Sequence, residues 1–231
     1  MVTINDEEML ATLYDVKDNG KEVAWKLKRL ITLRLAQSYK ILNNNKYESI
    51  VNCGGYLEFR RYEDSSMRLQ TAYFCKTRLC PMCCWRRSRK VFANVKNIFE
   101  SIEDDYKFLF LTLTIQNVSG NDLDITINKL FISYKNMCLL KRFKSAVKGW
   151  VRCFELTYNW QTNEYHPHFH ILLAVDINYF NSSLYIEQDE WCSMWKSSLR
   201  VDYTPIVDIR VFTESEQGKG KEIAEVTKYT I

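Results

Sequence analysis

All three histidines of this 231-residue chain lie within five positions, in the run His166-Pro-His168-Phe-His170. Alternate side chains of a β-strand point to the same face of its sheet, so the three imidazoles would line one face. Phe169 and Ile171 would then point the other way, into a hydrophobic core. The run therefore predicts a strand that is buried on one face and presents a row of potential metal ligands on the other.

A hairpin would place a carboxylate beside these histidines. The polar segment NWQTNE separates two β-rich stretches, which predicts paired strands over 151–158 and 165–175. With the turn centred near Gln161, Glu155 falls opposite His168, and directly opposed residues of an antiparallel pair share a face.

The predicted metal ligands are His168, His170 and Glu155. Two imidazoles, one carboxylate and open positions suit Mg²⁺ or Mn²⁺ that also holds a phosphate oxygen, although Zn²⁺ would bind as well. Pro167 has no backbone N–H to donate, so the strand could instead begin at His168. His166 would then support the ligands without binding the ion itself.

Eight cysteines occur in the chain, and residues 1–20 are too acidic and polar for a secretory signal, so we do not expect disulfides. Cys80 and Cys83 stand in a CPMC turn, in which two thiolates can face one tetrahedral cation, and Cys75 lies nearby. For the fourth ligand we favour Cys53, which two glycines follow, over Cys84. These residues predict a structural Zn²⁺ site.

Hydrophobic residues make up 46% of the chain and no apolar run is long enough to span a membrane, so we expect a soluble cytoplasmic protein. The net charge is only +4, yet residues 76–99 and 125–154 each carry seven Lys or Arg and no acid. A phosphate backbone would favour such zones, although many helices also carry solvated basic faces. In the first zone, the expected nucleic-acid contacts are Arg78, Arg86, Arg87, Arg89 and Lys90.

Hydrophobic periodicity predicts an α+β fold with a central, mainly antiparallel sheet and helices on its faces. Helices are expected over 21–42, 85–102, 126–148 and 189–198 and from 221 onward. Extended segments are expected over 51–59, 69–74, 107–115, 151–158, 165–175 and 206–212. The expected parts are an N-terminal helical segment (1–50), a zinc-binding and basic region (51–100) and a core (101–231).

The C-terminal segment contains a second group of reactive residues. On a helix, Glu225 and Tyr229 share a face, with Lys228 adjacent. A phenol can attack a phosphodiester when a metal polarises the phosphate and a cation eases loss of the phenolic proton. Glu and Tyr at this spacing are also common on ordinary helices, so this pattern needs further support.

Five segments in combination resemble the Rep proteins, which initiate replication of small rolling-circle plasmids of Gram-positive bacteria and belong to the HUH endonucleases. They are Cys53-Gly-Gly, FCKTRLCPMCCWRRSRK (74–90), LFLTLT (109–114), HPHFHILLAV (166–175) and the C-terminal E-x-x-K-Y. The chain departs from the family pattern at Cys83-Cys84, which doubles a position usually occupied once. It also ends at Ile231, soon after the tyrosine, which suggests a shortened chain or a short relative.

The resemblance implies an HUH or RRM-like sheet and a nickase that acts on single-stranded or hairpin origin DNA. His168 and His170 would bind the ion, and Tyr229 would form a 5′-phosphotyrosine and release a free 3′-OH. Glu225 would direct a water in the closing cleavage. Independently of the resemblance, its adjacency to Tyr229 makes Lys228 a candidate to stabilise the phenolate or phosphate. The implied partners are origin DNA and a host helicase and polymerase.

Other functions stay open at this point. A transposase or relaxase of the same superfamily would use the same site. A zinc-containing DNA-binding module would need the cysteines and basic zones but not the histidines. A metal-dependent nuclease that uses water would need the histidines but not Tyr229.

Overall fold

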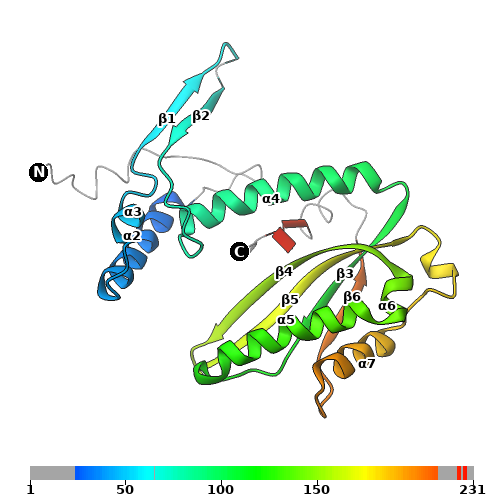
Figure 1. Cartoon of the computed structure of the whole chain (residues 1–231). Coiled ribbons are helices and arrows are strands. Elements are labelled where there is room, and N and C mark those ends of the chain that lie inside the picture. The colour runs from blue at the N-terminus through cyan, green and yellow to red at the C-terminus, as the bar shows by residue number, and fades with distance from the viewer. Residues whose placement is uncertain (1–23, 65, 213–222, 225, 228–231) are drawn as a thin grey trace, which may run out of the picture. The chain divides into compact units, whose positions relative to one another are not determined.

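The structure is a computed structural model that describes residues 24–64, 66–212, 223–224 and 226–227 (Figure 1). Contacts divide the chain into two compact units, residues 1–87 and 88–231, and each is described by itself. Among the described residues, no helix combines the length and the apolar character needed to cross a membrane.

The first unit holds two helices, a hairpin and the start of a third helix. Helix α2 (Trp25–Ile41) agrees with the prediction for 21–42, whereas the short helix α3 (Tyr47–Val51) was not predicted. Strands β1 (Leu57–Arg61) and β2 (Met67–Ala72) pair antiparallel. The predicted extended segment 51–59 is therefore wrong before residue 57, where the chain leaves α3 through turns.

Helix α4 (Pro81–Ile102) begins four residues earlier than the expected start at residue 85. Proline suits the first helical position because its missing N–H would have no partner there. The first helical bond runs from the Cys84 amide to the Cys80 carbonyl, at 2.8 Å. Cys80 therefore lies at the helix boundary and Cys83 in the first turn.

The second unit is built on a four-stranded antiparallel sheet of order β4-β5-β3-β6, so the predicted α+β class is confirmed. Its strands are β3 (Tyr106–Thr114), β4 (Val147–Asn159), β5 (Glu164–Asp176) and β6 (Val207–Val211). Two 3₁₀ turns, η1 (Gly120–Asp122) and η2 (Tyr179–Asn181), lie in the connections.

Helices α5 (Leu123–Leu139), α6 (Lys141–Ala146) and α7 (Gln188–Leu199) pack on one sheet face, against residues such as Leu111 and Phe169 (Figure 1). The single helix predicted over 126–148 is wrong. The backbone at Leu140 is extended, with φ −59° and ψ 135°, and separates α5 from α6. Val147 already belongs to β4.

The opposite sheet face is covered by the end of α4 and by the C-terminal residues that the structure describes. Val95 and Phe99 of α4 pack there against Phe108 and Phe110 of β3. Ile223 and Val226 join the same hydrophobic cluster, and residues 223, 224, 226 and 227 are helical, as predicted from 221 onward. This face is the one toward which the alternate residues of β5 direct the histidines.

Candidate metal centres and nucleic-acid contacts

The β4–β5 hairpin has the predicted register. Glu155 lies directly opposite His168, and Cys153 lies opposite His170. Glu155 and His168 are nearly buried, at 9% and 8% exposure. A carboxylate is costly to bury without a cation or a hydrogen-bond donor, so the buried Glu155 carboxylate needs such a partner.

Both imidazoles direct Nε2 at the same carboxylate oxygen. Glu155 Oε2 lies 3.1 Å from His170 Nε2 and 3.5 Å from His168 Nε2. The ligand atoms of these three residues all lie within 4.8 Å of one another. The structure therefore brings together the three predicted ligands.

The remaining nitrogen of each ring has a partner that fixes the ring. His168 Nδ1 donates to the backbone carbonyl of His166, at 3.1 Å. Thr112 Oγ1 on the neighbouring strand β3 lies 3.2 Å from His170 Nδ1 and can accept its proton. A protonated Nδ1 leaves the Nε2 lone pair of each ring available to an ion.

The separations between ligand atoms fit a single ion. With bonds of about 2.1 Å, neighbouring ligands lie about 3.0 Å apart in an octahedron and about 3.4 Å apart in a tetrahedron. The distances of 3.1 and 3.5 Å agree with either geometry. These three residues can thus hold a divalent ion and leave positions for a substrate.

His166 lies outside this set of ligands. Its Nδ1 is 2.7 Å from Asn117 Oδ1, and burial, with a smaller contribution from His168, lowers its pKa. The strand runs through Pro167, so the alternative in which it begins at His168 is wrong. The ladder to β3 ends at the Thr114–His168 pair, so Pro167 has a partner strand on one side only, where proline is tolerated.

The first unit contains a second cluster, made of Cys53, Cys75, Cys80 and Cys83. The sulfurs of Cys53 and Cys80, Cys53 and Cys83, and Cys75 and Cys83 are each 3.6 Å apart. In a tetrahedral Zn²⁺ site with bonds of about 2.3 Å, the sulfurs lie about 3.8 Å apart. The cluster therefore has close to the dimensions of a four-thiolate zinc site.

The thiols also influence one another electrostatically. The hydrogen bonds that Cys80 shares with Cys53 and then with Cys83 lower the pKa of Cys80, whereas the one between Cys53 and Cys80 raises the pKa of Cys53. Four adjacent thiolates would repel one another, so a bound cation is needed for all of them to ionise.

Backbone geometry favours Cys53 over Cys84 as the fourth ligand. Gly54, the next residue, has φ +75°, a conformation that favours glycine, and a Cβ there would lie 3.0 Å from Met82 Cε. The Cys84 thiol instead donates to the carbonyl of Arg78. Cys84 therefore has a different partner and lies outside the cluster.

The first basic zone follows the cysteine cluster into α4. Arg78, Arg86, Arg89 and Lys90 are exposed, whereas Arg87 is half-buried. The guanidinium of Arg86 lies 4.5 Å from the centre of the Phe74 ring. The exposed members of this zone are available to a phosphate backbone.

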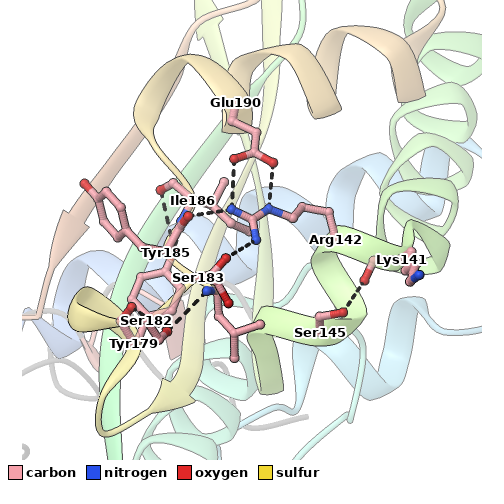
Figure 2. Close-up of polar contacts among 10 residues, drawn as sticks. Lys141, Arg142, Ser145, Tyr179, Ser182, Ser183, Tyr185, Ile186 and Glu190 are labelled. Carbon is pink, nitrogen blue, oxygen red and sulfur yellow. Dashed lines mark hydrogen bonds and ion pairs between the residues drawn. The ribbon is translucent and has the colours of Figure 1, made fainter.

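The second basic zone is partly used inside the protein. Figure 2 shows the Arg142 guanidinium facing the Glu190 carboxylate, with Nε–Oε1 and Nη2–Oε2 distances of 2.7 and 3.2 Å. The same guanidinium donates to the carbonyls of Ser183 and Tyr185. Arg142 therefore holds the segment before α7 in place and is not free for DNA.

Arg152 is also used internally, on the sheet face opposite the histidines. Its guanidinium lies 4.4–5.7 Å from the ring centres of Phe131, Tyr134, Trp150 and Phe169. Burial lowers the pKa of Arg152. Charge counting along the sequence could not separate Arg142 and Arg152 from exposed lysines.

The predicted catalytic residues Glu225, Lys228 and Tyr229 lie outside the described residues. Thr112 and Asn117, which contact the histidines, were not predicted. The LTLT pattern places threonines on alternate positions of β3, and it could have indicated that Thr112 contacts a histidine. Thr112 pairs with His170 across the sheet, so the two side chains share a face. Asn117 lies beyond the strand, and no sequence pattern marked it.

Comparison with known proteins gives a consistent result. Residues 66–231 match the family model described as a replication protein, Rep_1. A protein of Streptococcus pneumoniae named "Protein rep" is 42% identical over 95% of this chain and 71% of its own length. "Protein rep" of Bacillus amyloliquefaciens is 36% identical over 98% of this chain and 74% of its own length. "Protein rep" of Staphylococcus aureus is 32% identical over 82% of this chain and 83% of its own length. No solved structure matches.

The family match includes β3, the histidine strand and the C-terminal E-x-x-K-Y segment. It begins within the first unit and contains three of the four clustered cysteines. The segments that carried the resemblance in the sequence therefore lie almost entirely inside the matched region. The chain belongs to the Rep family of replication proteins, the rolling-circle plasmid initiators that its motifs resemble.

Proposed function

We propose that this Rep protein is a metal-dependent nickase of HUH type that opens one strand of single-stranded or hairpin origin DNA. One observation carries the proposal. Glu155, His168 and His170 converge on the same sheet face on which Ile223 and Val226 pack, close before Tyr229 in the sequence.

Each residue of the metal site has a defined task. Glu155, His168 and His170 would hold Mg²⁺ or Mn²⁺, and Thr112 and the His166 carbonyl would keep both Nε2 atoms aimed at it. A bound ion would neutralise the scissile phosphate and favour departure of the 3′ oxygen.

Tyr229 would be the nucleophile. It follows Val226 by three residues, so the two Cα atoms can be at most about 11 Å apart. The hydrophobic cluster that contains Val226 also contains Phe110, whose ring centre is 5.5 Å from that of His170. Anchoring at Val226 would therefore keep the tyrosine within reach of the metal site.

The reaction exchanges one phosphodiester for another. The Tyr229 phenol loses its proton to water, with Lys228 stabilising the phenolate, and its oxygen attacks phosphorus in line. The P–O3′ bond breaks and the 3′ oxygen takes up a proton. The products are a 5′-phosphotyrosine and a free 3′-OH that a polymerase can extend. Glu225 would later orient a water for the closing cleavage.

The cysteine cluster and the basic residues would have supporting roles. Cys53, Cys75, Cys80 and Cys83 would hold a structural Zn²⁺ that stabilises the first unit. Four exposed residues of the first basic zone (Arg78, Arg86, Arg89 and Lys90) would contact DNA phosphates, with Arg87 contributing from a half-buried position. We assign zinc binding to residues 51–100 and nicking to residues 101–231.

The test is nicking of a single-stranded origin oligonucleotide in Mn²⁺ by the wild type and by His170→Ala. We expect at least a 100-fold loss of rate in the variant, because one metal ligand is removed. DNA affinity, measured by fluorescence anisotropy, should stay unchanged, because phosphate contacts elsewhere carry it. Undiminished nicking by the variant would refute the metal-dependent mechanism.

A further inference from the structure

A cavity of about 470 Å³ lies beside the histidine row, at the end of β3. The segment after β3, the start of β5 and the segment before β6 form its walls. Besides Thr114 at the end of β3, its polar lining residues are Gln116, Asn117, Glu164, His166, Tyr203 and Thr204. The volume is in the range of small-ligand sites and exceeds what a single nucleobase needs.

Hydrogen bonds hold the walls of this cavity in place. The backbone amide of Gln116 donates to the Tyr203 hydroxyl at 3.1 Å, which joins the segment after β3 to the segment before β6. Val118 exchanges two backbone hydrogen bonds with Tyr165, at 3.0 and 2.8 Å, which joins the segment after β3 to the start of β5. The Thr114 hydroxyl donates to the Ile206 carbonyl at 2.9 Å. The cavity is therefore a built feature of the second unit.

The cavity lies one side chain away from the metal site. His166 lines it, and the ring centres of His166 and His168 are 5.0 Å apart. Thr114, another lining residue, pairs with His168 across the sheet. A group bound in the cavity would thus adjoin a phosphate held by Glu155, His168 and His170.

The lining chemistry disfavours an anion. Glu164 contributes a carboxylate, and among the residues that the structure describes no Lys or Arg lines the cavity. The amide groups of Gln116 and Asn117 instead offer donors and acceptors side by side. Within the described residues, the Gln116 side chain makes no hydrogen bond, and the Asn117 oxygen faces His166 at 2.7 Å, which leaves the Asn117 amide hydrogens for a ligand.

We propose that this cavity binds one unpaired nucleobase, the one next to the scissile phosphate. Amide side chains recognise the adjacent donor and acceptor of adenine, and the Tyr203 and His166 rings offer surfaces for stacking. This inference rests on the proposed nicking function and adds a specificity site to it. The base pocket would set the register of the strand, so that the correct phosphate meets the ion.

The experiment compares the wild type with Gln116→Ala and Asn117→Asp. Gln116→Ala keeps the backbone amide that contacts Tyr203, and Asn117→Asp keeps the oxygen that faces His166 while removing the amide donors. Asn128→Asp is the matched control, because Asn128 is exposed on α5, on the other sheet face. The substrate is a single-stranded oligonucleotide across the mapped nick, with one abasic site placed in turn at each nearby position.

We expect one position next to the nick at which the abasic site lowers wild-type kcat/KM about 10-fold or more. Gln116→Ala and Asn117→Asp should lower kcat/KM on the intact oligonucleotide, and the abasic site at that position should then lower it no further. Asn128→Asp should behave as the wild type on both substrates. A wild type that nicks but is insensitive at every position, or variants as sensitive as the wild type, would overturn the pocket.

A binding measurement separates failure of the pocket from failure of the nickase. In the same oligonucleotide, 2-aminopurine replaces each base in turn, and its fluorescence reports stacking without any cleavage. One position quenched by the wild type but not by Gln116→Ala supports the pocket even if no nick forms. Equal quenching by both proteins at every position would contradict it.

Discussion

The two clusters of potential metal ligands in this Rep protein are built in opposite ways. The cysteine cluster draws its ligands from three separate places: the end of α3, the end of β2 and the start of α4. The histidine cluster takes all three ligands from one hairpin, where strand pairing already sets their positions. Four thiols can enclose an ion completely, whereas two imidazoles and one carboxylate leave positions open.

This difference separates support of the fold from chemistry. Among the described residues, the cysteines surround a small core whose other buried member is Met82. A bound ion there would supply the stability that hydrophobic packing supplies elsewhere. The sheet beneath the histidines has large hydrophobic clusters on both faces, so we expect its packing not to depend on an ion. Loss of the first ion should therefore unfold a region, and loss of the second should only stop a reaction.

The largest effect should follow from Cys80→Ser. Structural zinc contributes on the order of 10 kcal/mol in small zinc modules, so the variant should lose its zinc and the fold of the first unit. Zinc analysis and circular dichroism would measure both losses. Cys192→Ser, in which the replaced thiol contacts the Pro205 carbonyl outside the cluster, is the matched control. A variant that folds normally without zinc would show that the cysteine site, like the histidine site, does not support the fold.

Brief treatment with EDTA should distinguish the two sites in one sample. The open site should release its ion, and nicking should fall at least 100-fold and return when Mn²⁺ is added. The thiolate-bound zinc should stay, because its coordination is complete. Zinc content and nicking rate, measured on the same sample, would give the result. Persistent nicking in EDTA would count against a catalytic ion.

A smaller effect is expected for Thr112→Val, which removes the hydroxyl beside His170 Nδ1. Loss of such a supporting group typically costs 10-fold to 100-fold in metal affinity or activity. The Mn²⁺ concentration for half-maximal nicking should rise about that much, while the rate at saturating Mn²⁺ changes little. Thr71→Val, on exposed β2, serves as the control. An unchanged Mn²⁺ requirement would show that Thr112 does not position the ring.

The smallest effect should be that of Cys84→Ser. Its thiol lies outside the four-cysteine cluster, so one equivalent of zinc should remain bound. Cys53→Ser should lose the zinc, because Cys53 lies within the cluster. Metal analysis of the two proteins, side by side, would identify the fourth ligand. The reverse pattern would assign that role to Cys84.

Local rules were sufficient to predict the histidine site. Alternation along a strand and the position of one turn place Glu155 opposite His168, and both rules act over a few residues. The choice of Cys53 also followed from a local feature, the two glycines that allow a tight turn after it, and Gly54 has φ +75° in the structure.

Features that depend on tertiary packing could not be predicted in this way. The break at Leu140 interrupts a segment whose hydrophobic pattern continues without a break. The internal use of Arg142 depends on Glu190, which lies 48 residues away. The cavity beside His166 forms where three segments meet, and a single stretch of sequence does not encode it.

In the mechanism that we propose, Tyr229 attacks DNA at an ion held by Glu155, His168 and His170. The most direct measurement is incubation with a 3′-tailed origin oligonucleotide and Mn²⁺, followed by boiling in detergent and electrophoresis. A phosphotyrosine ester is covalent, so the wild type should give a protein–DNA adduct that survives. Tyr229→Phe should lose adduct and nick together while keeping DNA affinity. An adduct formed by Tyr229→Phe at the wild-type level, or nicking by the wild type without any adduct, would rule out Tyr229 as the nucleophile.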